Sequence, residues 1–198
     1  MAASVRKSLP AIGFLTVLED GQHGLFGGYL VLNTAGRPLE FHCTTPVRPN
    51  RAQEILYGPT LRPYLYGEQI GQTLLAKAKS EPLAVCTDVE PALALRDFVS
   101  LPLALILADR EPAGQFPADE STSSELRLDG PHSSVPGPAA SRHIEFDLGS
   151  QRLAVPMAHL QDQKLVVERL QPYAESLDLS EPFERIRQAI QEAQRGGK

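Results

Sequence analysis

A short turn at residues 33–36, Asn-Thr-Ala-Gly, most constrains how this chain can fold. Asparagine at the first position and glycine at the fourth are typical of a type I turn that closes a β-hairpin. An apolar run at 27–32 precedes the turn, and an alternating run at 37–45 follows it. Another apolar run at 12–18 lies upstream, beyond a glycine-punctuated loop. The pattern predicts three consecutive strands, of which the last two form a hairpin.

Helix and strand signals alternate after the third predicted strand. Asn50 and Gln53 have the spacing of an N-cap and its capping partner, and a proline-led region at 63–79 predicts a second helix. Short apolar runs at 83–86 and 103–107 predict buried strands with a short helix between them. We therefore expect an α/β or α+β fold, in which a mixed sheet opens with a β-hairpin, helices pack on it and the C-terminus is helical.

Composition divides the chain into three segments. Residues 1–108 carry the predicted α/β core, and residues 142–198 carry a second predicted hairpin and two helices. Between them, residues 109–141 hold five prolines, many serines and an acidic excess, which cannot bury enough surface to offset the entropy of ordering. We expect a flexible insertion or linker there. We also expect residues 142–198 to complete the first domain, because a segment of that length forms only a marginal independent core.

Charge and cysteine content restrict the classes of function. A net charge of −5 and a pI of about 5.5 argue against a surface that coats nucleic acid or anionic lipid, and leave room only for a local basic site. No apolar run reaches the ~20 residues that span a bilayer, so we expect no membrane association. Cys43 and Cys86 form no CxxC pair, so we expect two reduced, buried thiols in a cytoplasmic protein.

Two polar residues of the third predicted strand have catalytic potential. Because side chains alternate along a strand, Glu40 and His42 share one face and lie about 7 Å apart. The predicted turn would place Gly28 opposite His42, which would leave space above the imidazole for a ligand. A carboxylate beside an imidazole can raise its pKa or orient it as a base or a metal ligand. An ordinary ion pair on a solvated sheet face has the same sequence pattern.

The order strand, strand, strand, helix, strand, helix, strand over residues 12–108 resembles that of the ribonuclease H-like fold. In that family, carboxylates on the first strand, the first helix and the end of the fourth strand hold two metal ions, which carry out phosphoryl transfer. The resemblance implies metal ligands at Asp88, which ends the fourth predicted strand, and at Glu54 or Glu68 on the helical region. The chain departs from the family pattern at Glu19, which lies at the end of the first predicted strand rather than inside it.

Arginines and tyrosines gather in the predicted helical region. The four candidate binding residues are Arg48, Arg51, Tyr57 and Tyr64. Such residues can stack on and neutralise a nucleotide or RNA, or the tyrosines can half-bury at a helix edge or a subunit interface. GxSxG, GxxxxGK[ST] and GxGxxG motifs do not occur in the sequence.

Two functions are compatible with these patterns. The first is a non-catalytic interaction or regulatory protein, whose final helix could dock a protein partner or a second copy through Phe183, Ile186 and Ile190. The second is a metal-dependent hydrolase or nuclease acting on phosphoester or nucleotide substrates, with a divalent metal held by Asp88 and Glu68. Its four candidate catalytic residues are Glu40, His42, Glu68 and Asp88. This second function requires the four side chains to meet in one pocket around Asp88.

Overall fold

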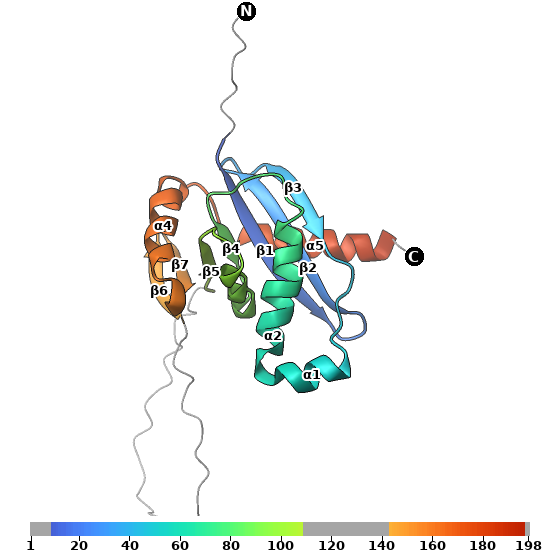
Figure 1. Ribbon diagram of the computed structural model, residues 1–198. Helices are drawn as coiled ribbons and strands as arrows, with labels where there is room; N and C mark the ends of the chain where they lie inside the picture. Colours follow the sequence, from blue (N-terminus) through green and yellow to red (C-terminus); the bar gives the residue numbers. More distant parts are fainter. Residues whose placement is uncertain (1–8, 109–142, 197–198) are drawn as a thin grey trace, which may run out of the picture.

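The computed structural model describes residues 9–108 and 143–196, which form one seven-stranded mixed sheet with helices on both faces (Figure 1). The strands are β1 (Ala11–Asp20), β2 (Gly24–Asn33), β3 (Pro38–Cys43), β4 (Val85–Thr87), β5 (Leu103–Ile106), β6 (His143–Leu148) and β7 (Gln151–Pro156). The α-helices are α1 (Arg51–Tyr57), α2 (Leu61–Pro63), α3 (Thr73–Leu75), α4 (Gln161–Leu170) and α5 (Glu181–Gly196). The other helical segments are the π-helix η2 (Tyr64–Gln72) and the 3₁₀ helices η1 (Gly58–Thr60), η3 (Glu90–Asp97), η4 (Met157–His159) and η5 (Gln171–Tyr173).

The strands follow the order β3-β2-β1-β4-β5-β7-β6 across the sheet. β1, β4 and β5 run parallel, and the other neighbouring pairs are antiparallel. The predicted α/β class, the opening hairpin and the helical C-terminus are therefore confirmed. The alternation of strands and helices that resembles the ribonuclease H-like order is present from β1 to β5. The insertion predicted at 109–141 lies outside the described residues.

The core forms one layer on each face of the sheet. On one face, α4 and α5 cover β1 and β2, and the rings of Phe14 and Phe183 meet edge to face with centroids 5.7 Å apart. On the other face, η2 and η3 cover Leu15 and Tyr29. The apolar face of α5, which the sequence offered as a docking surface, is thus packed on the chain's own sheet, with Ile186 completely buried.

Two adjacent glycines in β2 let the helical layers approach the sheet closely. A Cβ atom on Gly27 would collide with Ile70 of η2, and one on Gly28 would collide with Ile186 of α5. Because successive residues of a strand point to opposite faces, each glycine makes room for one layer. The space predicted for a ligand above Gly28 is therefore filled by Ile186.

The pairing of β3 with β2 differs from the expected register. Next to the turn the pairing is the expected one, but a β-bulge at Leu39 shifts the rest of the strand by one residue. His42 consequently pairs with Tyr29, so the predicted pairing with Gly28 was wrong. Cys43 is exposed because it lies on this edge strand, and its predicted burial was wrong as well. Cys86, in contrast, is buried in β4, which raises the pKa of its thiol to about 12.

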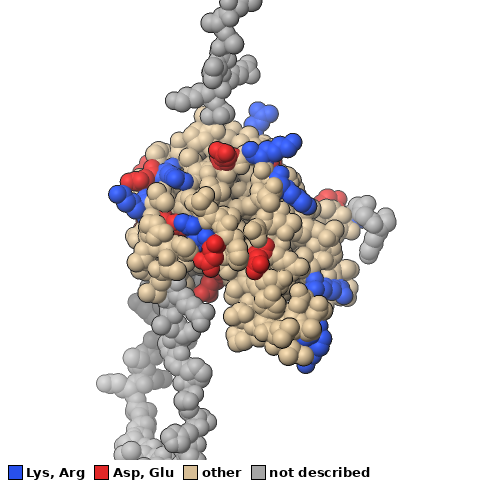
Figure 2. All heavy atoms as spheres, viewed as in Figure 1, with Lys and Arg blue, Asp and Glu red and all other residues tan. Residues whose placement is uncertain are grey.

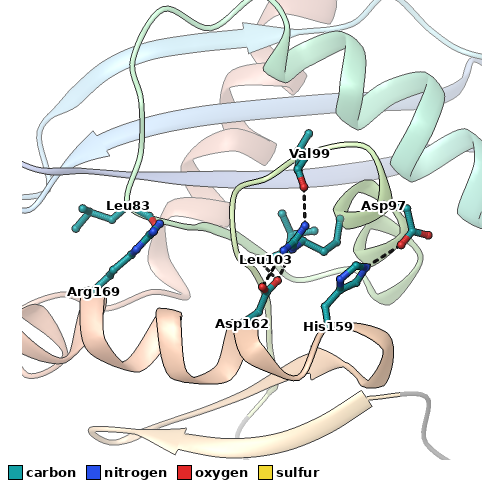
Figure 3. Close-up of polar contacts among 8 residues, drawn as sticks. Leu83, Asp97, Val99, Leu103, His159, Asp162 and Arg169 are labelled. Carbon is teal, nitrogen blue, oxygen red and sulfur yellow. Dashed lines mark hydrogen bonds and ion pairs between the residues drawn. The ribbon is translucent and has the colours of Figure 1, made fainter.

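Polar contacts anchor α4 to the first part of the chain (Figure 3). Asp162 is fully buried and accepts two hydrogen bonds from the Arg96 guanidinium, at 2.5 and 3.0 Å, and one from the Leu103 backbone N–H at 3.2 Å. Farther along α4, Arg169 donates to the carbonyl of Leu83 at 2.7 Å. Together with the pairing of β7 to β5, these bonds make residues 143–196 a continuation of the sheet that residues 9–108 begin.

Candidate functional site

Asp88 directly follows β4, at the position that the sequence predicted. Leu15 of β1 pairs with Thr87 of β4, so the next residues of these parallel strands, Thr16 and Asp88, lie side by side. Arg187 of α5 donates to the Asp88 carboxylate. The second carboxylate oxygen, Oδ1, is buried and has no hydrogen-bond partner among the described residues. The polar groups beside Asp88 are therefore a hydroxyl and a guanidinium, neither of which resembles the carboxylates of a metal site.

Glu40 and His42 lie on the other face of the sheet from Asp88, the face that η2 covers. His42 Nε2 lies 3.0 Å from Glu40 Oε2. Glu40 also accepts hydrogen bonds from the Ser80 hydroxyl and from the backbone N–H groups of Lys79 and Ser80. The Ser80 hydroxyl, the Lys79 N–H and His42 together lower the pKa of Glu40 to about 2. The carboxylate of Glu40 thus ties the edge strand to the segment that follows α3.

The other carboxylates of the predicted metal site lie apart from Asp88. Glu68 is exposed on η2, and Glu54 forms an ion pair with Arg51 on α1 at 3.0 Å. Across residues 9–108 and 143–196, no three His, Cys, Asp or Glu side chains are grouped so that they could hold a metal ion. The structure therefore brings Glu40 and His42 together, but places Glu68 and Asp88 elsewhere.

Glu19 lies inside β1, because the strand continues to Asp20, beyond the end at residue 18 that the sequence predicted. Its carboxylate accepts hydrogen bonds from the Tyr66 hydroxyl and the Arg62 guanidinium. These two contacts lower the pKa of Glu19, the Tyr66 hydrogen bond having the larger effect. Glu19 therefore ties β1 to the helical layer on the face of the sheet opposite Asp88.

The four candidate binding residues do not form one cluster. Tyr57 and Tyr64 are stacked, with ring centroids 4.1 Å apart and an angle of 23° between the ring planes. Arg51 is engaged in an ion pair within α1, and Arg48 Nε donates to the His23 carbonyl at 2.8 Å. The two tyrosines therefore join α1 to the start of η2, while the arginines have separate partners.

α1 leaves its apolar side chains in solvent. The predicted capping box is confirmed, since the Asn50 side chain accepts the Gln53 N–H at 2.9 Å and the Gln53 side chain accepts the Asn50 N–H at 3.0 Å. None of the seven residues of α1 is buried, and Ile55 and Leu56 are 67% and 81% exposed. α1 lies beyond the end of the sheet in Figure 1, and the lobe that holds it is mainly uncharged in the view of Figure 2.

A second polar region lies where η3 meets the β6–β7 hairpin. His159 Nε2 is 2.9 Å from Asp97 Oδ1, as Figure 3 shows, and His143 Nδ1 is 3.7 Å from Glu90 Oε1. Both pairs line one cavity of about 310 Å³. No sequence motif marks these four residues, because the two histidines come from a part of the chain more than 45 residues after η3. Only the tertiary fold brings them together.

No known protein family matches this sequence, and no curated protein is similar to it. A function therefore has to be inferred from the geometry of the described residues, because one fold can host many unrelated functions. Within residues 9–108 and 143–196, none of the helices has the length and apolar character needed to cross a bilayer.

Proposed function

We propose that this protein is a non-catalytic interaction protein, and that α1 docks into an apolar groove of a protein partner. The observation that carries the proposal is the exposure of Ile55 and Leu56 on a helix that has no buried residue. Single exposed apolar residues are common on protein surfaces, but two adjacent ones on a helix without a buried face contribute nothing to the chain's own core. Their burial by a partner would supply binding free energy.

The position of α1 favours a groove as the complementary surface. α1 projects from the end of the molecule, which allows a partner to surround it (Figure 1). A seven-residue helix against a flat surface buries less area than a stable interface needs. A groove that receives the helix covers more of its circumference, as in other helix-in-groove complexes. The capping box and the Tyr57–Tyr64 stack preorganise α1, which lowers the entropy lost on binding.

The surroundings of Asp88 support a role without catalysis. A guanidinium in contact with a carboxylate neutralises its charge and repels a divalent cation. The residue beside Asp88 on β1 is Thr16 rather than a carboxylate. We also infer that the protein works in the cytoplasm, where the exposed thiol of Cys43 would remain reduced.

Site-specific photocrosslinking tests this proposal in cells of the source organism. A photoreactive amino acid at position 56 is expected to form an adduct with one protein, and Ile55→Arg in the same chain is expected to abolish it. The matched control carries the photoreactive residue at the exposed position of Lys164 on α4 and should give no such adduct. Absence of an adduct at position 56, or the same adduct from both positions, would refute docking through α1.

A metal titration tests the non-catalytic part separately. A ligand that binds only the native state raises the unfolding midpoint by mass action. We expect Mg²⁺ and Mn²⁺ to shift the midpoints of the wild-type protein and of Asp88→Asn equally. A shift in the wild-type protein that Asp88→Asn abolishes would favour a metal-dependent hydrolase instead.

A further inference from the structure

The cavity between η3 and the β6–β7 hairpin has the shape and chemistry of a ligand site. Its volume is about 310 Å³. Proline, leucine and alanine side chains form its middle, among them Leu93, Ala94 and Pro156. Polar groups lie at its ends, because Glu90 and Asp97 are the first and last residues of η3. Seven steps of a 3₁₀ helix at about 2.0 Å per residue place these two residues about 14 Å apart along the helix.

Each end of the cavity combines a carboxylate from η3 with a largely buried histidine. At one end, His143 Nδ1 and Glu90 Oε1 are 3.7 Å apart, and this buried nitrogen has no hydrogen-bond partner among the described residues. Two acceptors at that separation can both receive hydrogen bonds from a single donor group placed between them. At the other end, the Asp97 carboxylate contacts His159 through Oδ1 only, which leaves its second oxygen able to accept.

The charge of the cavity selects the class of ligand. None of the residues that line it is lysine or arginine. Arg96, which neighbours Asp97 in the sequence, binds Asp162 and the Val99 carbonyl instead (Figure 3). The carboxylates of Glu90 and Asp97 therefore give the cavity a negative charge at each end when the histidines are neutral, which repels anions and attracts cations.

We propose that this cavity binds an aliphatic diamine or polyamine. One ammonium group donates to Glu90 and His143, another donates to Asp97, and the methylene chain between them packs on the apolar middle of the cavity. Ammonium–carboxylate hydrogen bonds are charge-assisted and hence stronger than neutral ones, and the methylene groups gain from burial. The site is independent of α1, so it can be tested separately from the proposed protein interaction.

Calorimetric titration of the full chain at low ionic strength tests the site with three ligands of one length. The probes are 1,6-diaminohexane, 1-aminohexane and 1,6-hexanediol. We expect the diamine to bind with one-to-one stoichiometry, the monoamine to bind about tenfold more weakly because one charge-assisted contact is lost, and the diol not to bind measurably. Absence of binding by the diamine, or equal binding by the diol, would overturn the proposal.

Single substitutions decide where the diamine binds. Asp97→Asn should weaken diamine binding about tenfold. The same variant should leave monoamine binding nearly unchanged, because a single ammonium group can still bind at Glu90. Glu90→Gln provides the same test at the other end, without touching the His159–Asp97 contact. Glu192→Gln, on the exposed surface of α5, removes the same charge far from the cavity and should have no effect. Equal weakening by all three variants would show attraction to an acidic surface and refute the site.

Discussion

α1 and α5 place their apolar side chains in opposite environments. α5 buries Phe183, Ile186 and Ile190 against β1 and β2, each with at most 2% of its surface exposed. α1 leaves Ile55 and Leu56 in solvent, although its N-terminus is capped by two hydrogen bonds. The comparison shows that apolar residues at helical positions do not by themselves identify a core helix. The surface that a helix meets decides whether it stabilises the fold or remains available for binding.

Truncation of the largest aromatic side chain of α5 should have the greatest effect on stability. Phe183→Ala removes a ring that is packed against Phe14, and large-to-small changes of this kind cost about 3–5 kcal/mol. Phe98→Ala is the matched control, because Phe98 is an exposed phenylalanine and surface changes usually fall within about 0.5 kcal/mol. Urea unfolding measures both variants. Equal losses would contradict the burial of the α5 face.

Gly28→Ala tests how closely α5 approaches the sheet. The added Cβ would collide with Cγ2 of Ile186, and overpacking of this kind costs about 1–3 kcal/mol. In an Ile186→Ala background this additional cost should largely disappear, since the colliding atom is gone, and a double-mutant cycle measures the coupling. Gly21→Ala is the control, because no atom lies within 4 Å of the position of its Cβ. A cost that is the same in both backgrounds would show that α5 does not press on Gly28.

The smallest effect is expected on α1. Ile55→Ser and Leu56→Ser should each change the free energy of unfolding by no more than about 0.5 kcal/mol, because neither side chain is buried. The same urea unfolding experiments give the value. A loss of several kcal/mol from either variant would remove the contrast between the two helices, since it would mean that α1 stabilises its own chain.

Local patterns in the sequence predicted much of the fold. The hairpin turn, the Asn50–Gln53 capping box and the apolar strands depend on neighbouring residues and are present in the structure. Gly67 and Gly71 likewise predicted a close helix contact, and a Cβ on Gly67 would indeed collide with the backbone of η3. The β-bulge at Leu39 was not predictable, because turn chemistry sets the register only next to the turn.

The environment of the candidate site depends on contacts between distant parts of the chain. Arg187 reaches Asp88 from 99 positions away in the sequence, and His159 reaches Asp97 from 62 positions away. No spacing rule relates residues so far apart, because their meeting depends on how α4 and α5 pack on the sheet. The sequence could therefore locate Asp88 at the end of a strand but could not identify the groups that surround it.

The irregular end of the sheet also affects how the molecule behaves at high concentration. β3 is an edge strand, and the unpaired backbone groups of such a strand can recruit a strand from another molecule. Pro38 lacks a backbone donor, the bulge at Leu39 disturbs the ladder, and Glu40 carries a charge within the strand. These three consecutive residues oppose the addition of strands, and so the feature that shifted the register of His42 also protects the protein from aggregation.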